Sequence, residues 1–513
     1  MIQLGGRQLV FNDFYQILFR GEKIALDQTA VEKVRKNHEF LRNFSKNKVI
    51  YGINTCFGPM AQYRISDEEI IDLQYNLIRS HSSGSGDPIP NIYVKALMIA
   101  RLNTLLQGYS GVNPYVLELI KELINHDIYP RIPEHGGVGA SGDLVQLAHL
   151  ALILIGEGEV HYKGRFVSTK DVFEELNLKP ITIHLREGLA LINGTSAMTG
   201  IGIINTIHAK NLLNWSVIAS SMINELVESY DDHFSKELNQ VKLHEGQRDI
   251  AESMRSILRD SKLIKKRADH LYNGQVTEQV IKEKVQEYYS LRCVPQIAGP
   301  ILDTVRNTEK VLTREVNSVN DNPIVDHENN NVFHGGNFHG DYVSLEMDKL
   351  KTAITKLSML AERQLNFLLN DKLNNKLPPF VNLGKLGLNL GMQGVQFTAT
   401  STVAENQTLS FPMSVHSIPN NNDNQDMVSM GTNAALLTKK VVNNSYEVIA
   451  IELITILQAI DYLELKDRLA GITKDKYKTL RILVPKFIED STKYQDVENV
   501  KEHLQVNQIE IIE

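Results

Sequence analysis

The feature of this sequence that most constrains its fold is a set of long stretches that contain neither proline nor glycine. From Ser196 onward these stretches carry apolar residues three and four positions apart, the spacing that places side chains on one face of an α-helix. The clearest runs from Tyr342 to Asp371, and a second runs from Ala434 to about Leu469. Helices of this length bury their apolar faces against one another, so the sequence predicts a bundle of long helices.

The chain before residue 196 carries a different signal. Up to about residue 195, glycine and proline recur throughout, which indicates loops between shorter helices. In the stretch after Ala434, apolar residues surround much of the helix, which places it in a bundle core or a subunit interface. Strand-like alternation is confined to short pieces such as 159–167. The predicted fold class is mainly α, with a loop-rich, mostly helical N-terminal domain over 1–195 and a long-helix bundle with a C-terminal helical domain over 196–513.

Composition and charge argue against several classes of protein. The net charge is −7 and basic residues form only short patches, so nucleic acid is not an expected partner. Cys56 and Cys293 fit neither a disulfide framework nor a zinc site, which is typical of a reducing compartment. Apolar runs stop short of the roughly 20 residues that a membrane span needs, and the N-terminus lacks a signal-peptide pattern. We expect a cytoplasmic, soluble protein with no membrane partner.

A cluster of glycines at residues 136–143 has two interpretations. It contains GxGxxG from Gly137, the pattern of a dinucleotide-binding turn. Such a turn must follow a buried parallel strand, yet the preceding residues include Pro130 and Pro133, which a central strand does not hold. The pattern alone is weak, and the mismatch argues against a nicotinamide or flavin site.

The second interpretation of the glycine cluster is chemical. The amide nitrogen of Gly142 can attack the carbonyl of Ala140, because Gly142 has no Cβ to obstruct the approach. Ser141, between them, can then lose its hydroxyl as water, which leaves 4-methylidene-imidazol-5-one, a strong electrophile. Asp143 onward reads as a helix, so this group would lie at a helix N-terminus. Taken alone, Ala-Ser-Gly is more simply read as an ordinary loop tripeptide.

The surroundings of this tripeptide change that balance. Eight blocks follow one another along most of the chain: YGINTCFGP at 51–59, NLIRSHSSGSG at 76–86, EHGGVGASGDLVQLAHLAL, GLALINGT at 188–195, QEYYSLRCVPQ at 286–296, NDNP at 320–323, GGNFHGD at 335–341 and NQDMVSMG at 424–431. Together they resemble the histidine and aromatic amino acid ammonia-lyase family. The resemblance implies a mostly helical fold and a homotetramer whose pockets are shared between three chains. It also implies a prosthetic group made from the chain itself, with no external cofactor or metal.

The resemblance assigns roles to residues around that group. The methylidene carbon from Ser141 would capture the substrate amine, and Tyr51 would act as the base that removes the β-proton. A phenol has a pKa near ~10, so Tyr51 needs nearby dipoles or cations that stabilise its anion. Asn193 resembles the family's asparagine beside the prosthetic group, and Tyr289 falls among its catalytic residues. Away from these blocks, Tyr51 would more simply be a core residue and Asn193 part of a turn.

Other residues of the blocks are candidates for substrate binding. Arg292 resembles the family's carboxylate clamp, since a guanidinium can hold a carboxylate through two parallel hydrogen bonds. If the segment is helical, Gln286, Tyr289 and Arg292 lie three residues apart on one face. Phe338 resembles the aromatic wall of the pocket, although it would also suit a core. His334 and His339 flank the same block, but no pattern of cysteines or carboxylates completes a set of metal ligands with them, so no metal site is expected.

Two residues bear on which amino acid is the substrate. His81 can hydrogen-bond a phenol or an imidazole, so it does not decide alone. Histidine-specific members usually carry a glutamate where this chain has Gln425, whose neutral amide favours a phenol or phenyl ring. A phenyl-only pocket would leave His81 without a partner, so tyrosine is the expected substrate and 4-coumarate and ammonia the products. Cys56 departs from the family's usual glycine and could narrow the pocket.

Three alternatives stay open at this point. A histidine ammonia-lyase, which forms urocanate, would keep the mechanism and change the substrate ring. A tyrosine 2,3-aminomutase would share the catalytic residues and return ammonia to the β-carbon. A helical interaction protein would leave Ala140 to Gly142 uncyclised, and its intact mass would retain the two waters that cyclisation removes.

Overall fold

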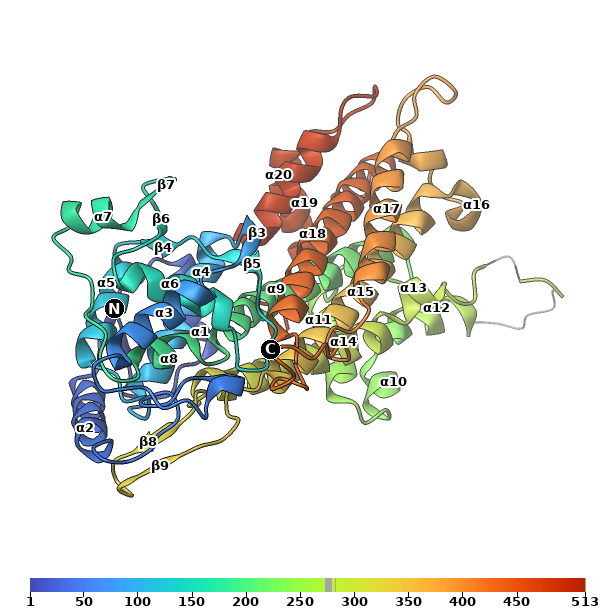
Figure 1. Cartoon of the computed structure of the whole chain (residues 1–513). Coiled ribbons are helices and arrows are strands. Elements are labelled where there is room, and N and C mark those ends of the chain that lie inside the picture. The colour runs from blue at the N-terminus through green and yellow to red at the C-terminus, as the bar shows by residue number, and fades with distance from the viewer. Residues whose placement is uncertain (273–278, 282, 513) are drawn as a thin grey trace. The chain divides into compact units, whose positions relative to one another are not determined.

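The computed structural model describes residues 1–272, 279–281 and 283–512. Figure 1 labels the helices and strands along the chain, which forms two compact units whose segments alternate in the sequence. The first unit contains Met1–Ile207, Thr308–Asp348 and Pro412–Lys439, and the second contains His208–Asn307, Lys349–Phe411 and Lys440–Glu513. The sequence predicts instead a single division, after residue 195, and that division into domains stays a prediction.

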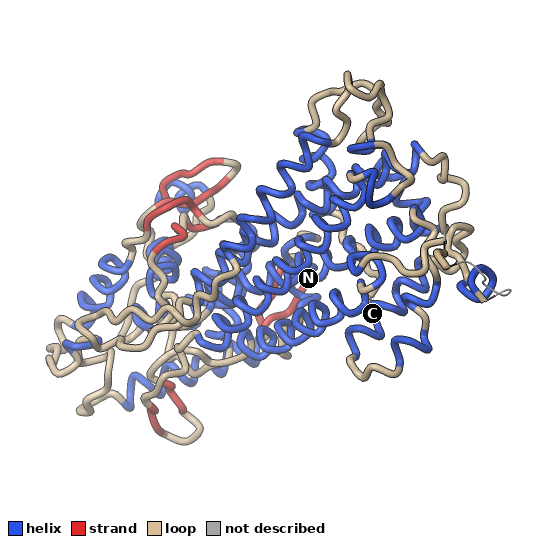
Figure 2. The backbone as a smooth tube through the Cα atoms, turned by 90° about the vertical axis from the view of Figure 1, so that its right-hand side faces the viewer, coloured by secondary structure: helices blue, strands red, loops and turns tan. Residues whose placement is uncertain are grey.

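Helices dominate the trace in Figure 2, so the expected mainly α class is confirmed. Helices within the first unit are α1 (Phe11–Phe19), α2 (Gln28–Phe44), α3 (Ile70–His81), α4 (Asn91–Leu106), α5 (Pro114–Asn125), α6 (Leu144–Leu154), α7 (Thr169–Glu175) and α8 (Glu187–Ile192). Helices within the second are α10 (Lys236–Gln240), α11 (Glu245–Ile257), α12 (Arg267–Leu271), α13 (Tyr289–Arg292), α16 (Asp371–Asn374), α17 (Gln393–Leu409), α19 (Gly471–Leu483) and α20 (Tyr494–Val506). Four longer helices have residues in both units: α9 (Ser196–Leu226), α14 (Val294–Val316), α15 (Asp341–Leu369) and α18 (Gly431–Tyr462).

The long helices follow the apolar periodicity of the sequence. Helix α15 matches the stretch predicted from Tyr342 to Asp371 to within two residues at each end. Helix α18 ends at Tyr462, short of the predicted Leu469, and Glu464 just beyond it adopts a left-handed backbone conformation with φ of 55°. Its apolar residues are buried on several sides within this one chain, which confirms the predicted burial. No helix of the described residues is long and apolar enough to cross a membrane.

The strands, drawn in red in Figure 2, are short, with two to four residues each. In the first unit β1 (Ile2–Leu4) pairs in parallel with β2 (Ile24–Leu26), and β8 (Ile324–Asp326) pairs antiparallel with β9 (Asn331–Phe333). The predicted alternation at 159–167 forms the hairpin of β6 (Glu159–Tyr162) and β7 (Arg165–Ser168). The residues before the glycine cluster form β4 (Tyr129–Pro130), antiparallel to β6, and β5 (Pro133–His135), antiparallel to β3 (Ser85–Pro88). These strands do not supply the buried parallel strand that a dinucleotide-binding turn follows.

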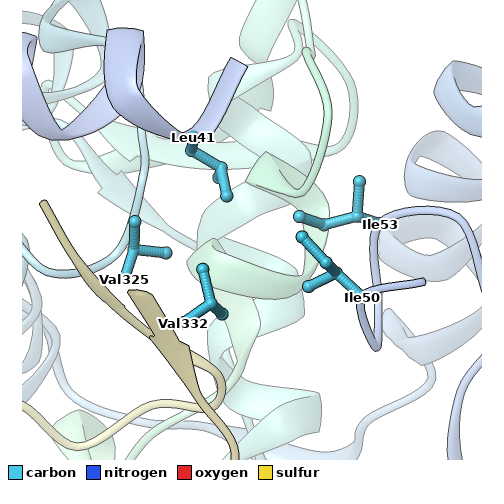
Figure 3. Close-up of a cluster of buried hydrophobic side chains, with 5 residues drawn as sticks. All are labelled: Leu41, Ile50, Ile53, Val325 and Val332. Carbon is cyan, nitrogen blue, oxygen red and sulfur yellow. The ribbon is translucent and has the colours of Figure 1, made fainter. Parts of the chain in front are cut away.

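Two parts of the first unit position the candidate site. Helices α3, α6 and α8 pack against one another, and α8 is buried along its whole length. An apolar cluster joins the end of α2 to the loop that follows it and to the β8–β9 hairpin (Figure 3). Its members are Leu41, Ile50, Ile53, Val325 and Val332. The loop after α2 is therefore anchored through its own isoleucines.

Candidate active site

A cavity of about 330 Å³ in the first unit is lined by many of the residues predicted from the sequence. Its lining includes Tyr51, Cys56, Ser80, His81, Ser141, Asn193, Phe338 and Gln425. These residues come from the loop after α2, the end of α3, the glycine cluster, the end of α8 and two later loops. The volume suits a small organic ligand such as an amino acid.

Two side-chain amides hold Ser141 in the cavity wall. The Asn193 amide donates to the backbone carbonyl oxygen of Ser141 at 2.8 Å, and the Gln425 amide donates to the Ser141 hydroxyl at 2.8 Å. Asn193 also accepts the backbone N–H of Asn322 through its side-chain oxygen at 2.8 Å. Asn193, predicted to stand beside the prosthetic group, thus joins the INGT and NDNP blocks to Ser141.

Gly142 sits where a larger residue would not fit. Its φ is +72°, and a Cβ built there would lie 2.0 Å from the carbonyl oxygen of Gly194. That same oxygen accepts the backbone N–H of Asp143 at 2.8 Å. Ala140 is buried and packs with Val428 and Met430. The tripeptide is therefore tightly enclosed, and its third position requires glycine.

Asp143 anchors the end of the glycine cluster through buried hydrogen bonds. Its buried carboxylate accepts the backbone N–H of Met198 at 2.9 Å and the hydroxyl hydrogen of Thr432. Burial raises the pKa of Asp143 to about 6, against the lowering effect of these donors. Helix α6 begins at Leu144, which confirms that the tripeptide precedes a helix N-terminus.

Tyr51 lies on the loop after α2, within residues 48–65, which we call the Tyr51 segment. The Tyr51 hydroxyl oxygen accepts the backbone N–H of Gly58 at 3.0 Å, and its ring lies edge-on to Phe57. Burial raises the pKa of Tyr51, and this hydrogen bond offsets the rise only in part. The described residues that line the cavity include no lysine or arginine. A phenolate at Tyr51 therefore needs a cation that this wall of the site does not supply.

His81 is the last residue of α3, and its surroundings favour the neutral imidazole. Its Nδ1 lies 2.9 Å from the carbonyl oxygen of Leu77, so Nδ1 carries the hydrogen and Nε2 is left as an acceptor. Burial lowers the pKa of His81, which favours the same neutral form. This tautomer suits a ligand group that donates a hydrogen bond.

Gln286, Tyr289 and Arg292 belong to the second unit and are not among the described residues that line this cavity. The prediction that they share one helix face is wrong, because α13 begins at Tyr289 and leaves Gln286 outside the helix. The three side chains nevertheless meet. The Arg292 guanidinium donates to the Gln286 side-chain oxygen and lies 4.8 Å from the centre of the Tyr289 ring. Tyr289 is 70% exposed, which leaves this polar group open to an incoming partner.

Several amides of the cavity were not predicted from the sequence. Asn76, Asn322, Asn421 and Asn424 all line it. The run of asparagines at 420–424 was a usable signal, since such a run supplies donors and acceptors but no charge. Among the residues that the structure describes, histidine, cysteine, aspartate and glutamate form no group of three that could hold a metal ion.

Comparison with known proteins gives a consistent set of relatives. Residues 9–482 match the aromatic amino acid lyase family. A histidine ammonia-lyase from Bacillus cytotoxicus is 38% identical over 508 residues, which are 99% of this chain and 97% of that one. The tyrosine aminomutase from Streptomyces globisporus has a similar structure, with a TM-score of 0.94 and 36% identity over 98% of this chain and 96% of that one. The structure of a histidine ammonia-lyase from Trypanosoma cruzi is also similar, with a TM-score of 0.87 and 31% identity over 98% of this chain and 93% of that one.

Proposed function

Since this chain belongs to the aromatic amino acid lyase family, we propose that it eliminates ammonia from L-tyrosine and releases 4-coumarate. The observation that carries the substrate assignment is the pairing of two neutral groups, His81 and Gln425, in the wall of the cavity that contains Ser141. Neutral groups suit an uncharged phenol better than an imidazole that can carry charge.

We further propose that Ala140, Ser141 and Gly142 form the 4-methylidene-imidazol-5-one group. The surroundings fit this group, because Gly142 is pressed against Gly194 and the Ser141 carbonyl already accepts the Asn193 amide. Once formed, the group supplies an electrophile that turns the substrate amine into a better leaving group. The same Asn193 hydrogen bond would withdraw electron density from the ring and strengthen that property.

The other steps fall to ordinary side chains. Tyr51, as the phenolate, would take the β-proton of the substrate while the amine leaves with the bonding electrons, so that a carbon–carbon double bond forms. The His81 Nε2 would accept the hydrogen bond of the tyrosine hydroxyl, and Phe338 would pack against the substrate ring. Loss of the Ser141 hydroxyl would free the Gln425 amide, which now binds it, to face the substrate.

The carboxylate of the substrate requires a cation, and we propose that a neighbouring chain supplies it. No arginine or lysine is among the described residues that line the cavity, whereas Arg292 stands beside Gln286 and the exposed Tyr289. In a homotetramer, these three residues of one chain would complete the pocket of another. Arg292 would hold the carboxylate and, as a nearby cation, lower the pKa that burial raises at Tyr51.

A histidine ammonia-lyase is the second candidate, favoured by the name of the Bacillus cytotoxicus relative. Gln425 separates the two, because a glutamate there would pair with an imidazolium or an imidazole N–H. We expect Gln425→Glu to move the ratio of kcat/KM values toward histidine by about tenfold, the effect of one charge-assisted hydrogen bond. The matched control is Asn424→Asp, which adds a carboxylate to the same cavity one residue away. An equal shift in both variants would contradict a specific role for Gln425.

The test of the proposed function is product analysis on the purified protein. We would incubate it separately with L-tyrosine, L-phenylalanine and L-histidine and follow both ammonia and the unsaturated acid. 4-Coumarate and ammonia rising together from tyrosine supports the proposal. Urocanate would overturn the argument from Gln425, and β-tyrosine would identify an aminomutase. Intact mass provides the second measurement, because a chain that retains both waters has no electrophile.

A further inference from the structure

A second and larger cavity in the first unit, of about 880 Å³, has a strongly basic wall. Four fixed cations line it: Arg42, Lys46, Lys48 and Arg64. Asp67 is the one carboxylate among its described lining residues. The lining residue His38 adds little charge, since burial lowers the pKa of its imidazole, whose Nδ1 lies 2.9 Å from the carbonyl oxygen of Gly111. The wall therefore carries a net positive charge, because one carboxylate does not balance four cations.

The two arginines of this basic cavity are available to a ligand. Among the described residues, the guanidinium groups of Arg42 and Arg64 have no hydrogen bond or ion pair. The Lys48 ammonium donates to the nearby Phe44 carbonyl oxygen at 2.8 Å. Planar guanidinium groups match the oxygens of a phosphoryl group through paired hydrogen bonds, and a phosphoryl dianion balances more positive charge than one carboxylate.

Part of the lining of the basic cavity is apolar. Ile53, Ile70, Ile71 and Leu185 contribute to its lining, so the ligand needs an organic portion as well as its charge. A volume of about 880 Å³ accommodates a phosphate ester with a sugar or a ring attached. An inorganic phosphoryl anion would contact the cationic part of the lining alone, so it serves as a minimal probe of the phosphoryl contacts.

The basic cavity and the active-site cavity share one partition, the Tyr51 segment. Lys48, Ile53 and Arg64 of this segment line the basic cavity, while Tyr51 and Cys56 line the other. The segment is a compact unit, because Asn54 accepts the backbone N–H of Ile50 at 2.9 Å and its amide donates to the Lys48 carbonyl. Figure 3 shows Ile50 and Ile53 turned toward Leu41, the residue before Arg42. A ligand held between α2 and the segment would restrict the motion of both.

We propose that the basic cavity binds a phosphorylated small molecule, which braces the Tyr51 segment against α2. The binding step stands on its own, and only its effect on catalysis rests on the proposed function of Tyr51. The ligand would then act as an effector that holds the base in place.

Calorimetric titration with sodium pyrophosphate, at constant ionic strength set by NaCl, tests the site. We expect saturable binding at one site per chain, and a loss of affinity of about tenfold or more in Arg42→Gln/Arg64→Gln. The control Arg35→Gln/Arg165→Gln removes the same charge from exposed positions outside the cavity and should stay within about twofold of wild type. No binding to the wild type, or equal weakening in both double variants, would overturn the proposal.

Two further measurements sharpen this test. Citrate, at the same ionic strength, should bind more weakly than pyrophosphate, and tighter binding would overturn the phosphoryl assignment. Amide hydrogen exchange within residues 48–65 should slow when pyrophosphate is present, and unchanged exchange would contradict the bracing. If Arg42→Gln/Arg64→Gln does not fold, Lys46→Gln/Lys48→Gln makes the same prediction. None of these readouts depends on lyase activity, so failure here differs from failure of the proposed function.

Discussion

The glycine cluster at 136–143 and the Tyr51 segment at 48–65 contribute to the same cavity, but the chain holds them differently. The cluster is tied to residues far away in sequence: Gly139 accepts the hydroxyl of Ser429 and the backbone N–H of Gly340, and Asp143 accepts the N–H of Met198. The Tyr51 segment depends mostly on bonds among its own residues, such as the backbone N–H of Cys56 to the carbonyl of Tyr63 at 3.0 Å.

This difference indicates that the cluster and the Tyr51 segment differ in how much conformational change each permits. Long-range ties and burial leave the cluster one conformation, which suits a backbone that must approach itself closely. A locally bonded segment with exposed residues opens at lower cost, which suits a group that must meet a substrate. Substitutions in the cluster should therefore act on formation of the electrophile, and substitutions in the segment on turnover.

The substitution that tests the cluster most severely is Gly142→Ala. The new Cβ would lie 2.0 Å from the Gly194 oxygen at a φ of +72°, so the backbone must shift and cyclisation should fail. We expect activity to fall by about a thousandfold or more, with an intact mass that retains both waters. Gly164→Ala is the matched control, since its φ of +81° is similar but no atom lies within 4 Å of its added Cβ. A Gly142→Ala protein that still loses both waters would contradict the proposed role of the cluster in forming the electrophile.

In the Tyr51 segment, the largest effect is expected from Tyr51→Phe. Removal of the hydroxyl takes away the proposed base, so kcat should fall by about a hundredfold to ten thousandfold. The intact mass should still show loss of both waters, because the cluster is untouched. Tyr63→Phe, an exposed tyrosine of the same segment, should change neither quantity. Tyr51→Phe with an unformed electrophile would show that the two regions are not separable.

Asp143 offers a test of how tightly the cluster is buried. Its pKa of about 6 lies above the ordinary value near ~3.9, so the folded state binds the proton more strongly than the unfolded state does. The associated stability is present below about pH 4 and is lost as the pH rises through 6. Relative to Asp143→Asn, the free energy of unfolding of the wild type should fall by about 2 kcal/mol between pH 4 and pH 8. Urea midpoints across this range measure it, with Asp171→Asn, a substitution in the surface helix α7, as the control.

Part of the fold could be predicted from the sequence. Apolar periodicity predicted the long helices, because a helix face that is buried along its length requires apolar residues three and four positions apart. The end of α18 was missed, since the left-handed turn at Glu464 carries no glycine or asparagine to mark it. Gln286 was wrongly placed on a helix face, because spacing alone does not say where a helix begins.

The site itself was only partly predictable. Motif blocks identified Ser141, Asn193 and Gln425, and the structure places all three together. The buried support of Asp143 by Thr432 depends on contacts 289 residues apart, which local sequence does not encode. The basic cavity was also missed, since Arg42 and Arg64 look like solvated surface charges until α2 and the Tyr51 segment are folded together.

Cys56 provides the smallest and most local probe of the segment. It lines the cavity, yet its backbone is not in the left-handed region, unlike that of its neighbours Gly52 and Gly58. Cys56→Gly adds backbone freedom and should lower kcat/KM for tyrosine by about threefold, whereas Cys56→Ala keeps the backbone restricted and should stay within about twofold of wild type. Equal losses in both variants would assign the effect to the thiol rather than to the flexibility of the segment. Cys293→Ala, in the second unit, controls for the removal of any thiol and should leave steady-state kinetics unchanged.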